Sequence, residues 1–308
     1  GPFTVVHLGD IVGPAGLGSK QDSSRAAETA RADALLALVQ NLPNGRLYFV
    51  PGDRDWANSG PDGLKRVRRL EEYLEKRLPN QNAFVLEAFG EPLAISSGYY
   101  QRYGCPHHAG WTWQTKAHNS LLVDGEGQVP RSFASKGFVT EFANTDQFAY
   151  TTGDATAAYG GRLKRFLRHV LFARPDYFVI YDDIEAAQPA TYQWLLHARS
   201  EFQLEPAKLT LTSAQGHARL RVQFLLPGKL DFSQTDQFDI PPEKPDSPNQ
   251  WHFRAATTTP AATMGFLTVL LPYRAGEEAK LPACRALAAT GGVVAQVGRD
   301  LIAWKAPG

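Results

Sequence analysis

The feature that most constrains this chain is a long succession of short aromatic and β-branched segments that begins near Pro92 and runs toward the C-terminus. Glycine, proline and aspartate separate the segments, and helical patterns are scarce among them. Such a pattern is typical of antiparallel strands joined by turns. The expected strands are Ser120–Asp124, Phe138–Phe142, Phe166–Phe172, Tyr177–Asp182, Tyr192–His197, Lys208–Thr212, Leu220–Leu225, Trp251–Ala255, Phe266–Pro272, Val293–Val297 and Leu301–Trp304. A single open sheet of that size would expose its edges, so we predict two packed sheets in a large antiparallel β-sandwich.

Residues 1 to 86 have a different character. Apolar strand patterns alternate with amphipathic helix patterns, in the order Phe3–Leu8, Ser23–Gln40, Leu47–Val50 and Leu64–Leu78. The alternation of strand and helix predicts a small parallel α/β unit. The sequence therefore predicts a mainly β protein with two domains, an α/β segment at 1–86 and the sandwich at 87–308. Within the sandwich, the proline-rich stretch Asp239–Asn249 is expected to be a surface loop.

Composition excludes several classes of protein. The formal net charge is +1 and no long basic run occurs, which argues against a nucleic-acid partner. The longest apolar stretches, such as Phe266–Pro272, are far shorter than a membrane span, and we expect no membrane contact and no export signal in the chain itself. Cys105 and Cys284 form no metal-ligand pattern. They are interpreted as thiols, with a single disulfide as the alternative.

Three carboxylates follow the two N-terminal strand patterns. Asp10 follows the first strand, and Asp53 and Asp55 follow the second. Open α/β sheets bind ligands at these strand ends. The string Val50-Pro51-Gly52-Asp53-Arg54-Asp55-Trp56, with Asn58-Ser59-Gly60, resembles a calcineurin-like metallophosphoesterase over about the first 85 residues.

This N-terminal resemblance is incomplete. In the family, two metal ions clamp a phosphate, and histidines supply several of their ligands. Here Asp53 and Arg54 stand where the family has asparagine and histidine, and no Gly-His-x-His follows. We therefore favour Asp10 and Asp53 as helix caps, and keep a single bound cation or a phosphoesterase centre of Asp10, Asp53 and Asp55 as alternatives.

The richest stretch runs from Ser97 to Gln128 and combines aromatics, histidines and cations. Within it, Gln114–Ser120 and Val123–Gln128 closely resemble heparinase II/III-like polysaccharide lyases, especially the alginate and oligoalginate lyase branch. The match continues in order through Gly153–Ala155, Tyr159, Arg162, Arg168–Phe172, Tyr181–Asp183 and Trp194–His197. An ordered match of this length is far more specific than any single motif.

The resemblance implies β-elimination on a polysaccharide that contains uronic acid. That reaction needs a group that neutralises the carboxylate, a base and an acid. We interpret His107, His108 and Tyr100 as catalytic candidates. The substrate-binding candidates are Tyr99, Arg102, Trp111, Lys116, Asn119 and Arg162. The alternative for the histidine pair is a structural or solvent-exposed role.

Two further charged groups have competing interpretations. Arg162, Arg165 and Arg168 alternate with apolar residues, and a solvated strand face is favoured over a carboxylate-binding row. Asp182-Asp183 is interpreted as a strand end that enters a turn.

The resemblance also implies one structural metal, commonly zinc, held between strands of the sandwich. His118, Asp154 and His197 are the candidate ligands, and two histidines with one carboxylate suit tetrahedral zinc. The alternative is that His118 and His197 are core histidines that bond to the backbone.

In the lyases that the chain resembles, an α/α toroid precedes the sandwich and completes the catalytic cleft. The residues before position 91 are too few for a toroid and have an α/β pattern. We therefore expect a lyase-type domain that lacks half of its site, acting on or binding an acidic polysaccharide such as alginate or a heparin-like glycan. The alternatives are a non-catalytic carbohydrate-binding or structural β-domain and a metal-dependent phosphoesterase. A periplasmic or secreted location would follow from the lyase resemblance.

Overall fold

The computed structural model describes the backbone of residues 4–8 and 46–50, residues 23, 25–27, 29, 30 and 33, and residues 81–305 apart from 100, 102, 103, 131 and 133. The chain divides into two compact units, Gly1–Pro79 and Asn80–Gly308. The division falls before the expected boundary at 86/87, because Phe84 forms a β-bridge with Asn119 and thus joins the second unit.

In the first unit, strands β1 (Thr4–Leu8) and β2 (Arg46–Val50) pair in parallel, with Thr4 opposite Arg46 and Leu8 opposite Val50. Residues 25–27, 29, 30 and 33 are helical and fall inside the helix predicted at 23–40. The predicted helix Leu64–Leu78 lies outside the described residues. The parallel pair is the arrangement expected of an α/β segment.

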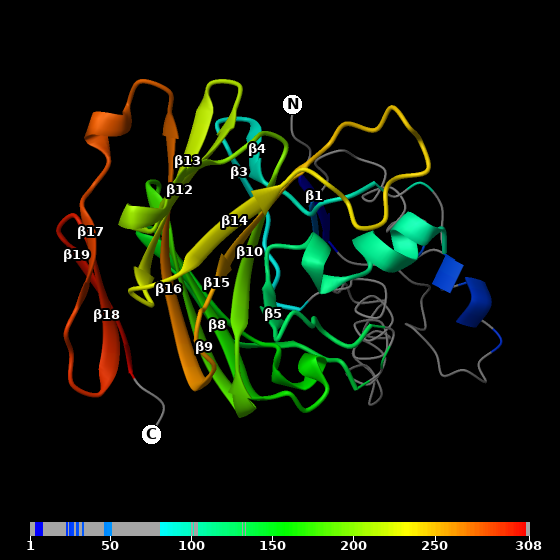
Figure 1. The fold of residues 1–308 in the computed structure, drawn as a ribbon, viewed down its shortest axis with the longest axis horizontal. Coiled ribbons are helices and arrows are strands. Elements are labelled where there is room, and N and C mark those ends of the chain that lie inside the picture. The colour runs from blue at the N-terminus through cyan, green and yellow to red at the C-terminus, as the bar shows by residue number, and fades with distance from the viewer. Residues whose placement is uncertain are drawn as a thin grey trace. The chain divides into compact units, whose positions relative to one another are not determined.

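The second unit is built from antiparallel sheets (Figure 1). The largest has eight strands in the order β11-β12-β13-β16-β9-β8-β7-β6, and a four-stranded sheet has the order β14-β15-β10-β5. The eight strands are β6 (Phe138–Asn144), β7 (Phe148–Asp154), β8 (Leu163–Ala173), β9 (Tyr177–Ala190), β11 (Gln203–Glu205), β12 (Thr210–Gln215), β13 (Ala218–Leu226) and β16 (Ala261–Arg274). The four strands are β5 (Leu121–Val123), β10 (Tyr192–Ala198), β14 (Asp231–Thr235) and β15 (Trp251–Ala256).

Smaller elements complete this unit. A hairpin pairs β3 (Leu86–Ala88) with β4 (Glu91–Ala94), and a three-stranded sheet has the order β17-β18-β19. The strands of that sheet are β17 (Cys284–Leu287), β18 (Gly292–Val297) and β19 (Asp300–Lys305). The short helices are the π-helix η1 (His108–Thr112) and the 3-10 turns η2 (Thr115–Ala117), η3 (Thr156–Tyr159), η4 (Pro206–Lys208) and η5 (Glu278–Lys280). No helix of the described residues is long and apolar enough to cross a membrane.

The main core lies between the eight-stranded and four-stranded sheets, as a sandwich requires. Alternation along each strand creates it: in β13 the side chains of Leu220, Val222 and Phe224 are buried, and in β15 those of Phe253 and Ala255 are. Side chains that alternate along a strand point to opposite faces of its sheet. The sequence-based fold class, mainly β with a large antiparallel sandwich, is therefore confirmed.

The three-stranded sheet adds a third layer, visible at the left of Figure 1. It packs on the outer face of the eight-stranded sheet through a second core, in which Trp304 and Val297 contact the side of β9 that carries Val179 and Tyr181. The long strand β9 is thus covered on both faces. Successive residues of β9 are therefore buried: in Tyr177–Ile184 every side chain is buried except that of Phe178, which is partly exposed.

The predicted strands of the sandwich are confirmed, although several shorter strands were not predicted. Each predicted strand overlaps an observed one, whereas β3, β4, β7, β11, β14 and β17 were missed. Most of the missed strands are short or carry polar residues on exposed edges. The expected loop is confirmed, because residues 236–250 form no helix or strand.

Two interpretations of charged residues are wrong. Arg168 is 2% exposed and Asp182 is fully buried, and they form a two-pronged ion pair inside the sandwich with Nε–Oδ1 and Nη2–Oδ2 distances of 2.6 and 2.7 Å. Arg168 is therefore no part of a solvated face. Asp182 does not end a strand, since β9 continues to Ala190. The same Arg168 donates to the carbonyls of Asn82 and Asn119, so every arm of the guanidinium is satisfied.

Candidate functional site

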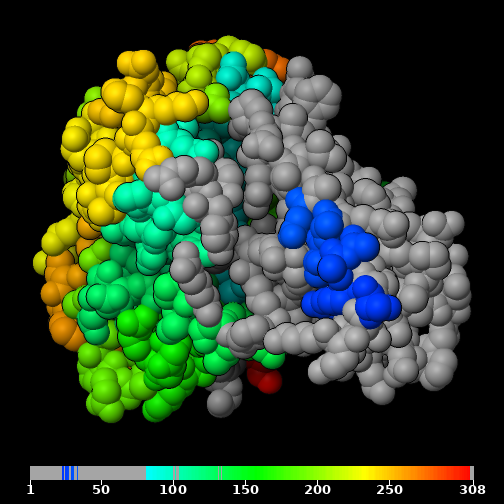
Figure 2. All heavy atoms as spheres, turned by 90° about the vertical axis from the view of Figure 1, so that its right-hand side faces the viewer, coloured from blue at the N-terminus to red at the C-terminus, as the bar shows by residue number. Residues whose placement is uncertain are grey.

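Five of the eight histidines gather around the outer face of the four-stranded sheet, the face turned away from the main core. His197 and His252 stand on β10 and β15 directly opposite each other, with ring centroids 5.3 Å apart. His107, His108 and His118 come from the segment that contains η1 and η2. The proline-rich loop 236–250 packs against this segment, as the yellow and teal atoms of Figure 2 show. We call this arrangement the histidine cluster.

His107, which directly precedes η1, bonds to the loop 236–250. The ring is fully buried, its Nδ1–H donates to the carbonyl of Ile240, and its Nε2 accepts the backbone N–H of Tyr99. Burial lowers the pKa of His107, partly offset by the bond to Ile240. Both ring nitrogens are therefore engaged by backbone groups, which gives the predicted catalytic residue a positioning role in this geometry.

His108 also has a local structural contact. It is 3% exposed, its Nδ1 accepts the N–H of Gly104 at 2.8 Å, and its ring packs on Trp113 at 4.6 Å. Tyr100, the third catalytic candidate, lies outside the described residues. The catalytic roles of these three residues stay predictions.

A buried serine–histidine pair lies beneath the loop. Ser97 Oγ is 2.8 Å from Nε2 of His252, while Nδ1–H of His252 donates to the carbonyl of Gln237. The indole of Trp111 donates to the same Ser97 oxygen at 3.3 Å, and its ring contacts that of His252 in a tilted arrangement with centroids 4.7 Å apart. Trp111 is 1% exposed, so its ring is a packing element here and offers no open face to a sugar.

Four of the five rings in the cluster share one bonding arrangement. His107, His118, His197 and His252 each donate one N–H to a backbone carbonyl, those of Ile240, Thr112, Lys116 and Gln237 respectively. Burial lowers the pKa of His118 and of His252 to about 4, and lowers that of His197 well below its usual value. Burial therefore favours the neutral form of these four rings.

The predicted substrate-binding residues divide into accessible and buried groups. Tyr99 is partly exposed and donates its hydroxyl to the carbonyl of Pro248, and Lys116 is 27% exposed and pairs with Asp239 at 2.6 Å. Asn119 is fully buried, and its amide bonds the backbone of Phe84, Ile95 and His197.

Asn119 thus joins three segments of the fold and keeps no free group for a ligand. Arg162 donates to the carbonyl of Gly127, and its buried Nε has no hydrogen-bond partner among the described residues. Arg102 lies outside the described residues.

The predicted zinc ligands do not meet in the structure. His118 bonds Ser96 and Thr112 through its two ring nitrogens, and Asp154 accepts the N–H of Thr156 at the start of η3. Across the described part of the chain, no three His, Cys, Asp or Glu side chains are grouped to hold a metal ion. The geometry matches the alternative of core histidines bonded to the backbone, and the zinc assignment stays a prediction. Asp10, Asp53 and Asp55 lie outside the described residues, so the phosphoesterase centre stays a prediction as well.

Several residues of the face were missed by the sequence interpretation, among them Ser97, Phe238, Gln250, His252 and Arg254. The sequence does contain a signal for His252 and Arg254. In the predicted strand Trp251–Ala255, His252 and Arg254 alternate with Phe253 and Ala255, which predicts a polar face opposite the core. Phe238 had no such signal, because its contacts with Trp111 at 5.2 Å and His107 at 5.2 Å depend on how the loop folds back.

Comparison with known proteins identifies the second unit. The family model described as heparinase II/III-like, C-terminal, matches residues 79–285. Among solved structures, a heparinase III gene product superposes with a TM-score of 0.59 at 15% identity, covering 72% of this chain and 36% of the other. Heparan sulfate lyase HepC from Pedobacter heparinus superposes with a TM-score of 0.57 at 17% identity, covering 73% and 36%. The chain thus spans about a third of the length of these structures, and no curated protein sequence matches it.

Proposed function

Because this chain belongs to the heparinase II/III-like C-terminal family, we propose that its β-sandwich is the glycan-facing half of a polysaccharide lyase-type protein. The substrate class is a polysaccharide that contains uronic acid, such as a heparin-like glycan or alginate. The observation that carries the proposal is the polar outer face of the four-stranded sheet, where the histidine cluster, Tyr99 and Lys116 lie together. The solved structures with this fold include a heparinase III and a heparan sulfate lyase, which supports the substrate class.

The chemistry of β-elimination explains what such a face contributes. The reaction removes a weakly acidic proton beside a carboxylate, so cations and hydrogen-bond donors must stabilise the negative charge that develops. Lys116 and Tyr99 carry groups of this kind, which in the structure donate to Asp239 and to the carbonyl of Pro248. His107 places the backbone of Tyr99 through the bond to its N–H, which orients this part of the face.

Two assays on the full chain test the proposal. Ultraviolet absorbance of the unsaturated uronate product is followed with alginate, heparan sulfate and hyaluronan, and binding of the same glycans is measured by calorimetry. Product formation supports a lyase. Binding without product supports the non-catalytic carbohydrate-binding alternative, and absence of both overturns the proposal.

A variant pair locates the contact. We expect Lys116→Gln to weaken glycan binding about fivefold, equivalent to roughly 1 kcal/mol, because it removes one partly exposed positive charge. Lys164→Gln is the control, since Lys164 is 61% exposed on the eight-stranded sheet. Equal losses in both variants would mean that binding is not specific to this face.

The predicted metal is tested separately. Elemental analysis of the purified protein and of His118→Ala measures bound zinc directly. A zinc content that depends on His118 would support the prediction, and an unchanged content would remove His118 from the ligand set.

A further inference from the structure

Strand β15 places two basic residues on the outer face of the four-stranded sheet. His252 and Arg254 are two residues apart, so they project from the same face, while Phe253 and Ala255 enter the core. The register puts Arg254 between Leu195 on β10 and Ser233 on β14. Arg254 is therefore next to the histidine cluster, within the face proposed to meet the glycan.

Arg254 is partly buried, yet it forms no hydrogen bond or ion pair with the described residues. Its two cross-strand neighbours, a leucine and a serine, carry no negative charge. Asp239 lies near enough for Arg254 to lower the pKa of its carboxyl group, but this aspartate is already paired with Lys116 at 2.6 Å. Asp231, diagonal to Arg254 on β14, forms no ion pair with it.

The surroundings of Arg254 leave it open to a ligand on one side. Ser233, directly across from it, is exposed and lies on β14, which is the edge strand of the sheet. On the other side the neutral rings of His252 and His197 supply no charge that would repel or replace an anion. A partly buried cation that forms no ion pair attracts an anionic group more strongly than an exposed one, because less water screens its charge.

We propose that Arg254 binds the anionic group of an acidic saccharide on this face. The assignment rests on the proposed function and adds to it the residue that selects an acidic ligand. A guanidinium fork matches the two oxygens of a carboxylate and equally those of a sulfate, so it donates two parallel hydrogen bonds. The hydroxyl of Ser233 adds a third donor on the open side. The bound saccharide then runs along the edge strand β14 toward Lys116.

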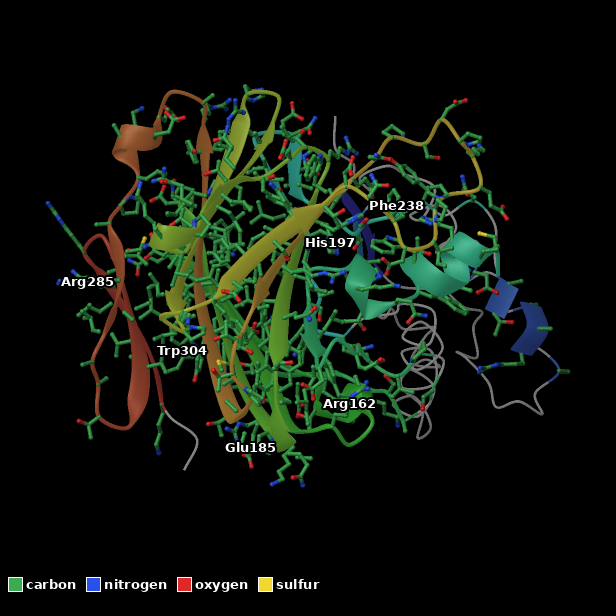
Figure 3. All side chains as sticks on the ribbon, viewed as in Figure 1. Arg162, Glu185, His197, Phe238, Arg285 and Trp304 are labelled. Atoms are coloured by element: carbon green, nitrogen blue, oxygen red, sulfur yellow. The ribbon has the colours of Figure 1, made fainter. Side chains whose placement is uncertain are left out.

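The experiment measures binding and not turnover. Calorimetric titrations use a mannuronate tetrasaccharide, a heparin-derived tetrasaccharide, the same heparin tetrasaccharide after chemical desulfation, and neutral cellotetraose. The variants are Arg254→Gln, Arg254→Lys and the control Arg285→Gln. Arg285 also has an exposed cationic side chain, but it stands on β17 of the three-stranded sheet, on the opposite side of the sandwich from His197 (Figure 3).

We expect Arg254→Gln to weaken binding of the acidic tetrasaccharides about tenfold or more, the size of a lost charge-assisted hydrogen bond, and Arg254→Lys to restore only part of it. Arg285→Gln and cellotetraose should show no such change. If desulfation abolishes the effect of Arg254→Gln, the anionic group is a sulfate. If the effect persists on the desulfated and mannuronate ligands, the group is a carboxylate.

A second measurement separates this proposal from the proposed function. The Nε–H resonance of Arg254, assigned by its absence in Arg254→Gln, is followed by nuclear magnetic resonance during titration with glucuronate and with inorganic sulfate. A saturable shift in a protein that neither binds nor cleaves polymers supports the Arg254 site and overturns the proposed function. Tetrasaccharide binding that is equal in wild type and Arg254→Gln overturns the Arg254 site and leaves the proposed function standing. Neither a shift nor tetrasaccharide binding overturns both.

Discussion

At the scale of single residues, an ion pair is buried in the interior of the sandwich. Arg168 and Asp182 are almost completely inaccessible, and the indole of Trp194 donates to the same carboxylate at 3.1 Å. The guanidinium reaches Asn82 and Asn119 as well, so one side chain joins the start of the sandwich to its core. A buried pair of this kind is costly to break, because the remaining charge has no partner.

We expect Asp182→Asn to lower the free energy of unfolding by about 3 to 5 kcal/mol, because it leaves the Arg168 charge buried and unpaired. Urea denaturation followed by tryptophan fluorescence measures the loss. Asp183→Asn is the matched control. That neighbour pairs with Arg165 on the other face of β9, where both side chains are partly exposed at 10% and 24%, and its loss should be about 1 kcal/mol or less. Equal losses would contradict the special cost of the buried pair.

At the scale of elements, the histidine cluster joins η1, the loop 236–250 and the four-stranded sheet through neutral rings. His107, His197 and His252 each donate an N–H to a carbonyl of another segment, so protonation of the second nitrogen would put a charge into a buried site. The cluster therefore connects the elements of the face only while its histidines remain neutral.

This predicts a pH dependence of stability. The pKa of His118 and of His252 falls from 6.5 to about 4 on folding, so between these values the unfolded chain binds more protons than the folded one. Stability is then complete above about pH 6.5 and is lost as the pH falls toward 4, on the order of 3 kcal/mol per ring. Urea midpoints measured across this range should fall with pH. His252→Gln should flatten the slope, whereas His217→Gln, at an exposed position, should not.

The edge strand β6 exposes apolar side chains. All seven of its residues are exposed, including Phe138 at 56%, Val139 at 72% and Phe142 at 72%. An apolar strand with an open edge promotes pairing between molecules.

We expect Phe142→Lys to reduce concentration-dependent association measured by light scattering. The free energy of unfolding should change by less than about 0.5 kcal/mol, because the side chain is not packed. Val85→Lys removes an exposed apolar residue outside this strand and should leave association unchanged. A similar reduction in both variants would argue for general surface hydrophobicity as the cause.

At the scale of the whole second unit, three layers share one long sheet. The outer face of the eight-stranded sheet is apolar where β18 and β19 cover it, so the third layer should unfold together with the sandwich. Trp304 is 8% exposed and contacts Tyr181 at 5.5 Å.

We expect Trp304→Ala to cost about 3 kcal/mol and to preserve a single unfolding transition. Circular dichroism and fluorescence during the same denaturation measure this, with Leu301→Ala as the control at a position 66% exposed. Two separate transitions, or no loss of stability, would show that the three-stranded sheet is an independent layer.

The sequence by itself determined the class of the fold and the family, because both depend on local patterns. Alternation of apolar and polar residues locates strands such as β13 and β15, and ordered motifs from Gln114 to His197 predicted the heparinase II/III-like family that the comparison confirms. Alternation also predicts which face of β15 carries His252 and Arg254.

Only the tertiary structure decided what those side chains do. Whether Arg168 meets solvent or Asp182, and whether Trp111 meets a sugar or Phe238, depends on which strands and loops lie across from them. These partners are distant in sequence, and no local pattern encodes the distance between them. Burial and hydrogen bonding depend on these distant partners, which is why four histidines of the cluster were singled out in the sequence while their common position and their bonds to the backbone were not.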